Sequence, residues 1–99
     1  MNEIEKLHNM LNEAGIVHEF GPRLDGHYIR VYDPNKPFES GGYDYIVDAI
    51  YFRGSYGYEE GLIEIAGYIK SDDVPDTVEG WLTAEEIFNR IMTYKEEHP

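Results

Sequence analysis

The chain contains no cysteine among its 99 residues, and it has no long apolar run. Without cysteine there are no disulfides and no thiolate metal site, which fits the cytoplasm of a bacterial host cell. Because no run of about 18 apolar residues occurs, we expect no membrane-spanning helix. The first six residues lack a basic region followed by an apolar one, so we expect no signal peptide.

Basic residues are scarce. Lys and Arg together number 8 against 20 Asp and Glu, which gives a formal net charge of -12. A surface of that sign repels phosphates and attracts basic protein surfaces. We therefore expect no binding to nucleic acid or to an anionic membrane. The acidity could also serve solubility alone, and that interpretation stays open.

Motifs for catalysis and for cofactor binding are missing as well. The glycines between Arg53 and Gly61 match neither nucleotide-binding fingerprint, and the lysine of a phosphate-binding loop is absent. None of the three serines lies in a nucleophile elbow, and the four histidines lack the spacing of a metal-binding motif. We therefore expect no catalytic residues, no metal, no cofactor and no enzymatic activity.

Hydrophobic residues make up 41% of the chain and aromatic residues 14%, enough for one folded domain over residues 1–99. Residues 2–14 are predicted to form a helix that is capped by Asn2, with Glu5 at the third helical position. Strands are predicted at 16–20, 27–32 and 43–53. The dipeptide Asp25-Gly26 predicts a hairpin turn between the first two strands.

The second half of the chain is harder to interpret. Apolar residues recur at helical spacing and predict a helix over 58–69, although Gly61 and Gly67 each weaken it by about 1 kcal/mol relative to alanine. A fourth strand that begins at Leu62 is the alternative. The pattern Thr83-Ala-Glu-Glu86 is a capping box, and it predicts a last helix over 83–95.

These elements predict an α+β domain in the order α-β-β-β-α-α. We expect a three-stranded antiparallel sheet with the helices packed on one of its faces. The core is expected to draw apolar residues from the helices and strands alike: Leu7, Leu11, Ile29, Val31, Val47, Leu62, Ile65, Ile87 and Ile91.

Acidic residues gather in the connector 71–80 and in the segment 58–69, and two tyrosines beside them lie off the apolar stripes. We predict that these residues form a partner-binding surface whose carboxylates imitate the spacing of phosphates. Its members are Asp72, Asp73, Asp76, Glu79, Glu60, Glu64, Tyr56 and Tyr68. Trp81 is instead expected to pack at the entry to the last helix.

The segments GSYGYEEGLIEI (54–65) and EGWLTAEE (79–86) resemble a family of small acidic uncharacterised proteins encoded in phages and mobile elements of Firmicutes-type bacteria. The resemblance covers most of the chain, including both terminal helices. No activity is assigned to that family, so no functional residue is carried over. The resemblance implies an anti-defence, anti-CRISPR-like context, because small acidic phage proteins often block host enzymes, some as DNA mimics.

The leading hypothesis is an acidic inhibitor that occupies a basic surface of a host nucleic-acid-handling protein such as a nuclease. A small regulatory or self-associating module, for example a homodimer, is the alternative. A small-molecule-binding domain comes third.

Overall fold

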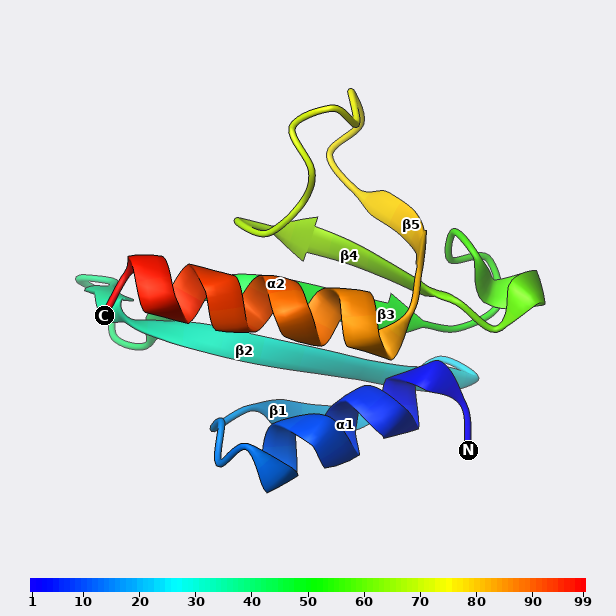
Figure 1. Cartoon of the computed structure of the whole chain (residues 1–99), viewed down its shortest axis with the longest axis horizontal. Coiled ribbons are helices and arrows are strands. Elements are labelled where there is room, and N and C mark those ends of the chain that lie inside the picture. Colours follow the sequence, from blue (N-terminus) through cyan, green and yellow to red (C-terminus); the bar gives the residue numbers. More distant parts are fainter.

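Five antiparallel strands form one sheet, and two helices pack on one of its faces (Figure 1). The structure is a computed structural model, and it describes all 99 residues. The elements follow the order α1 (Glu3–Glu13), β1 (Glu19–Arg23), β2 (Gly26–Pro37), β3 (Tyr43–Tyr51), β4 (Ile63–Gly67), β5 (Glu79–Leu82) and α2 (Ala84–Glu97). A short 3-10 turn, η1 (Tyr58–Glu60), precedes β4.

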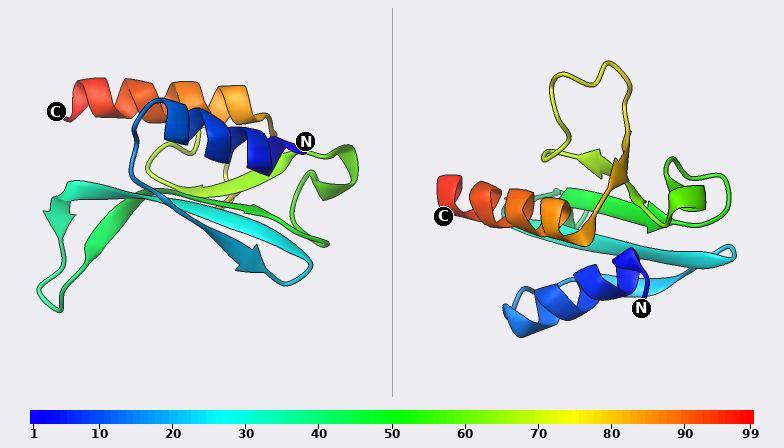
Figure 2. Two further views of the ribbon diagram at one scale, coloured as in Figure 1. Left: turned by 90° about the horizontal axis from the view of Figure 1, so that it is seen from below. Right: turned by 45° about the vertical axis from the view of Figure 1, so that its right-hand side comes forward.

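The sheet is a meander in which each strand pairs with the next one along the chain. Its register aligns Ile29 of β2 with Ala49 of β3, and Ala49 with Ile65 of β4. All three side chains are 0% exposed. Because side chains alternate between the two faces of a strand, this row defines the face that the helices cover (Figure 2).

Both helices begin at the caps that the sequence predicts. The side chain of Asn2 accepts a hydrogen bond from the N–H of Glu5 at 2.9 Å, and the Oγ of Thr83 accepts one from the N–H of Glu86 at 3.2 Å. The glutamate side chain reaches back to the cap residue in each case, which completes both capping boxes. Neither helix combines the length and the hydrophobicity that crossing a bilayer requires.

A carboxylate of α1 also caps α2. The Oε1 of Glu3 accepts a hydrogen bond from the backbone N–H of Ala84 at 2.8 Å, across 81 positions of sequence. This bond lowers the pKa of Glu3, and the ammonium of Lys6 lowers it further. The two helices therefore start at the same end of the molecule, where Figure 1 shows the N-terminus beside the first turn of α2.

The core joins seventeen buried hydrophobic residues from both helices, four strands and two loops. Eight of the nine predicted core residues are buried, and the exception, Leu62, is half-buried. Ile46 and its neighbour Val47 are both buried, although successive side chains of a strand normally point to opposite faces. A register shift of β3 against β2 at this point allows both side chains to face inward.

The prediction of a three-stranded sheet is wrong, since the sheet has five strands. The predicted helix over 58–69 is also wrong, and the alternative of a fourth strand is confirmed. Ile63 and Ile65 alternate with half-buried residues, while Gly61 and Gly67, both inside the predicted helix, adopt φ of 77° and 119°, which a right-handed helix does not allow. β5 escaped prediction because it is only four residues long and includes a glycine.

Strand boundaries moved as well. β1 starts at Glu19 and not at Ile16, and Ile16 instead packs into the core from the loop after α1. β2 continues to Pro37, five residues beyond the predicted end at Tyr32, and β3 ends two residues early at Tyr51.

Candidate protein-binding surface

The chain between β3 and β4 forms a rigid double turn over residues 52–62. The hydroxyl of Ser55 donates to the carbonyl of Phe52 at 2.7 Å, and it accepts from the N–H of Phe52 at 3.2 Å. The second turn closes where the N–H of Leu62 donates to the carbonyl of Gly57 at 2.9 Å. Ser55 is only 7% exposed, so its hydroxyl serves this turn and does not face solvent.

Tyr56 and Trp81 form a stacked aromatic pair at the surface. Their ring planes differ by 9°, their centroids lie 5.6 Å apart, and the residues are 44% and 55% exposed. Backbone hydrogen bonds hold the pair: the N–H of Trp81 donates to the carbonyl of Tyr56 at 3.3 Å. The N–H of Tyr56 donates to Oε1 of Glu64 at 2.9 Å. We call this pair the Tyr56–Trp81 platform.

Two glycines allow the double turn and β5 to approach each other this closely. A Cβ at Gly80 would lie 2.2 Å from the Cβ of Tyr56, and a Cβ at Gly57 would lie 2.8 Å from the backbone nitrogen of Trp81. Both distances are shorter than van der Waals contact, so any other residue would force the two segments apart. The glycines thus determine the position of the platform.

Trp81 adopts a left-handed backbone conformation, with φ of 58°. For an L residue with a Cβ this conformation costs roughly 1–2 kcal/mol, because the Cβ approaches the following carbonyl oxygen. Burial of the indole does not explain the cost, since Trp81 is 55% exposed. Strained backbone of this kind concentrates at functional sites. The strain therefore marks Trp81 as a candidate functional residue.

Exposed carboxylates lie in the groove beside the platform and in the loop that leads into β5. Glu59 and Glu60 of η1 are exposed, and together with Tyr56 and Trp81 they line a groove of about 530 Å³. Residues 71–78 form an acidic loop that connects β4 to the start of β5 (Figures 1 and 2). Its three aspartates are all exposed: Asp72, Asp73 and Asp76.

Glu79 is placed differently from these carboxylates. Its two oxygens accept hydrogen bonds from Arg90 of α2 at 2.8 and 3.0 Å, and its side chain is 12% exposed. The Arg90 guanidinium lowers the pKa of Glu79, and the N–H of Ser71 lowers it further by donating to the same carboxylate. Glu79 thus anchors the base of the acidic loop, and its charge is compensated within the fold.

Glu64 and Tyr68 also have partners of their own. Glu64 lies half-buried on β4 and accepts the hydrogen bond from Tyr56, so it positions the platform. Tyr68 follows the last residue of β4 and is 52% exposed, as predicted. Its hydroxyl donates to Asp44 at 2.8 Å, and the ammonium of Lys36 lies 3.6 Å from its ring centroid. The structure therefore separates Tyr68 from Tyr56.

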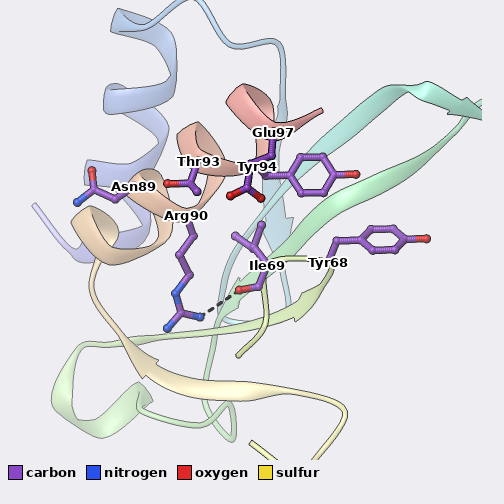
Figure 3. Close-up of a pocket in the computed structure, with 7 residues that line it drawn as sticks. All are labelled: Tyr68, Ile69, Asn89, Arg90, Thr93, Tyr94 and Glu97. Carbon is purple, nitrogen blue, oxygen red and sulfur yellow. Dashed lines mark hydrogen bonds between the residues drawn. The ribbon is translucent and has the colours of Figure 1, made fainter. Parts of the chain in front are cut away.

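Tyr68 belongs to a shallow groove of about 320 Å³ along α2. Figure 3 shows that Tyr68 and Tyr94 extend in the same direction, away from Arg90, whose guanidinium donates to the carbonyl of Ile69 at 3.1 Å. Two charged residues line this groove: Arg90, which is paired with Glu79, and Glu97, which is exposed near the end of α2. The groove lacks the stacked aromatic pair that the Tyr56–Trp81 platform provides.

Sequence reasoning missed Trp81 as a surface residue. The prediction that it packs at the helix entry is wrong, because the residue next to the Thr83 cap is Leu82, which is 3% exposed and fills that position. The available signal was the dipeptide Gly80-Trp81 after an acidic loop. A glycine before a lone aromatic indicates close backbone approach, but it does not reveal which segment approaches.

Two of the four histidines meet in the structure. The Nδ1 of His8 lies 2.8 Å from the Nε2 of His18, whose Nδ1 lies 2.8 Å from the carbonyl oxygen of Ile16. Since a carbonyl only accepts, His18 donates from Nδ1 and accepts from His8 at Nε2. Burial lowers the pKa of His8, and the neighbouring His18 lowers it further. No group of three or more potential metal ligands occurs in the structure.

Comparisons with protein families, with curated proteins and with solved structures found no match to this chain.

Proposed function

We propose that this protein is an acidic protein-binding domain that occupies a basic surface of a nucleic-acid-handling protein and thereby inhibits it. One observation carries the proposal: a stacked and exposed aromatic pair, Tyr56 and Trp81, shares a groove with the exposed carboxylates of Glu59 and Glu60. Exposed tyrosine and tryptophan are the residues most enriched at the energetic centres of protein interfaces.

Charge determines the class of partner. The formal net charge of -12 favours a basic surface through long-range attraction, and it disfavours nucleic acid. Proteins that handle nucleic acid carry such basic surfaces, because they neutralise phosphates with lysine and arginine. The exposed carboxylates of Glu59, Glu60 and the acidic loop are the groups that would replace those phosphates. The resemblance to small acidic phage proteins supports a host enzyme as the target.

The acidic loop can be tested by charge reversal. We expect Asp72→Lys/Asp73→Lys/Asp76→Lys to abolish inhibition, because it removes the attraction between the acidic loop and a basic partner surface. The matched control reverses three exposed glutamates elsewhere, Glu13, Glu39 and Glu96. Each variant replaces three acidic residues by lysine, and each replacement raises the net charge by two. Both variants therefore change the net charge from -12 to -6.

The measurement has two stages. The wild-type protein first captures partners from a bacterial lysate, and each captured nucleic-acid-binding protein is then purified and titrated with labelled DNA in the presence of each variant. We expect the wild type and the control triple variant to displace DNA, with weaker displacement at higher salt, whereas the loop variant fails. Equal displacement by both triple variants, or no displacement by the wild type, would overturn the proposal. A dimer in light scattering, without displacement, would favour the self-associating module.

A further inference from the structure

We propose that the Tyr56–Trp81 platform binds the guanidinium group of an arginine side chain, with Glu59 and Glu60 as its carboxylate partners. This inference rests on the proposed function, and it specifies which chemical group of the basic partner is recognised. The supporting observations are the built geometry of the platform, the carboxylates in the same groove, and the absence of any cation of this chain over either ring.

The platform is preorganised before any partner arrives. Gly57 and Gly80 fix the distance between the two backbones, and hydrogen bonds to Glu64 and between Trp81 and Tyr56 fix the orientation of the pair. A binding surface held in place in this way loses little conformational entropy on association. Trp81 adopts a φ of 58° and stays 55% exposed although it stacks on Tyr56, so more than half of the residue remains available to a partner.

Cations stack on other aromatic rings of this chain. Arg30 lies 5.4 Å from the ring centroid of Tyr28 and pairs with Asp48, with 3.5 Å between Nε and Oδ1. That arrangement combines an aromatic face with a carboxylate around one guanidinium. The groove beside the Tyr56–Trp81 platform offers the same combination, with two carboxylates and without an occupant from the chain.

One cation, Arg53, also lines the groove. Its side chain is 84% exposed, and its Nε lies 3.8 Å from Oδ2 of Asp25 in the β1–β2 turn. Arg53 lies over neither ring of the platform, so the platform is open to a guanidinium from outside.

The geometry favours arginine over lysine and over a nucleobase. A guanidinium is planar, stacks on aromatic rings and can bond to two carboxylate oxygens at once, whereas an ammonium is a compact and strongly hydrated charge. Tryptophan gives the strongest cation–π attraction of the aromatic residues. A nucleobase could stack equally well, but its phosphates would meet Glu59 and Glu60, and no basic residue compensates that repulsion.

Trp81 is the only tryptophan of the chain, so its fluorescence reports directly on the platform. The experiment titrates the full-length protein with three short unstructured peptides that are identical except for two positions, which hold arginine, lysine or citrulline. Citrulline keeps the shape of arginine and lacks its charge. We expect a saturating fluorescence change with the arginine peptide at a Kd roughly three- to tenfold below that of the lysine peptide, and none with citrulline.

The variant Glu59→Gln/Glu60→Gln keeps Trp81 and removes both carboxylates, so we expect it to bind the arginine peptide about tenfold more weakly. The control Glu13→Gln/Glu96→Gln makes the same change in net charge at exposed sites away from the groove, and we expect it to bind like the wild type. Equal affinities for the arginine and lysine peptides, no binding of either, or binding of a single-stranded oligonucleotide would each overturn the inference. If DNA displacement by the protein persists in those cases, the proposed function stands and only the arginine assignment fails.

Discussion

The helix-covered core and the β4–β5 end of the molecule follow local sequence rules to different degrees. In the core, both helices start at complete capping boxes, and buried residues alternate with less buried ones along β2 and β4. At the β4–β5 end, a tryptophan adopts positive φ and two glycines stand where any Cβ would clash. Positions that break local rules without a gain in packing are expected at functional sites. This difference separates the residues that fold the chain from those that present its surface.

We expect the largest loss of unfolding free energy when a buried residue that joins α2 or β4 to the core is truncated. Ile87 of α2 and Ile65 of β4 are each 0% exposed, so replacing either by alanine should cost about 2–5 kcal/mol in unfolding free energy. Denaturant melts measure this loss. Leu62→Ala, at a half-buried position, should cost less than either. A cost below about 1 kcal/mol for Ile65→Ala would mean that β4 does not belong to the core.

A second variant tests the contact between the double turn and β5. Gly80→Ala places a Cβ 2.2 Å from the Cβ of Tyr56, and the repacking should cost about 1–3 kcal/mol. We also expect a shift in Trp81 fluorescence, because the stack opens. Gly54→Ala is the control: it has φ of 100° but no neighbour within 4 Å, so it introduces backbone strain without the clash. If Gly54→Ala shifts the Trp81 emission as much as Gly80→Ala does, the close approach is not what fixes the platform.

A third prediction concerns the buried carboxylate of Asp33, which is 2% exposed. The hydroxyl of Tyr94 donates to its Oδ2 at 2.6 Å, so Tyr94→Phe leaves that oxygen without this donor and should cost about 1–3 kcal/mol. Tyr28→Phe removes a hydroxyl that bonds to the exposed Glu19, and it should cost less than about 0.5 kcal/mol. Equal costs for the two variants would contradict the assignment of Asp33 to the interior.

Acid should destabilise the protein through carboxylates that anchor the loop and the helices. Hydrogen bonds from Arg90, Tyr94 and Ala84 lower the pKa values of Glu79, Asp33 and Glu3, respectively. A folded-state pKa below the unfolded value means that the unfolded chain binds more protons, so stability is fully present above the unfolded pKa and falls with pH. We expect the loss to begin at about pH 5 in urea melts.

The variant Glu79→Gln isolates one of these groups. Its unfolding free energy should depend less on pH than that of the wild type, because glutamine does not titrate. A pH dependence identical to that of the wild type would mean that the Glu79–Arg90 pair contributes nothing to the acid sensitivity.

The sequence predicted the parts of the fold that rest on local chemistry. The caps at Asn2 and Thr83, the hairpin between β1 and β2 and eight of nine core residues are confirmed. The turn of that hairpin consists of Leu24 and Asp25 and not of Asp25 and Gly26, because Gly26 already pairs with Arg23. The prediction of a helix over 58–69 was wrong because the apolar residues of this segment fit both helical spacing and, in part, the alternation of a strand. In a short segment the spacing of apolar residues does not by itself distinguish a helix from a strand. The glycines at 57 and 61 carried the information that favoured the turn and strand.

The candidate surface was only partly accessible from the sequence. Exposure of Tyr56 and Tyr68 is confirmed, but their separation depends on the course of β4, and the stack of Tyr56 on Trp81 joins residues that lie 25 positions apart. The pairing of Glu79 with Arg90 likewise depends on how α2 packs beside β5. Contacts between distant segments follow from tertiary packing, which overrides local patterns.

The most direct test of the central claim is the variant Trp81→Gly, measured for both stability and binding. Glycine relieves the strain at φ of 58° and adds freedom to the unfolded chain, so these two effects nearly cancel, and the loss of the stack on Tyr56 remains. We expect the unfolding free energy, followed by circular dichroism, to fall by no more than about 2 kcal/mol. Calorimetric titration with the arginine peptide should show no binding. A stability loss above about 3 kcal/mol would show that Trp81 serves the fold, and unchanged binding would show that it serves no partner.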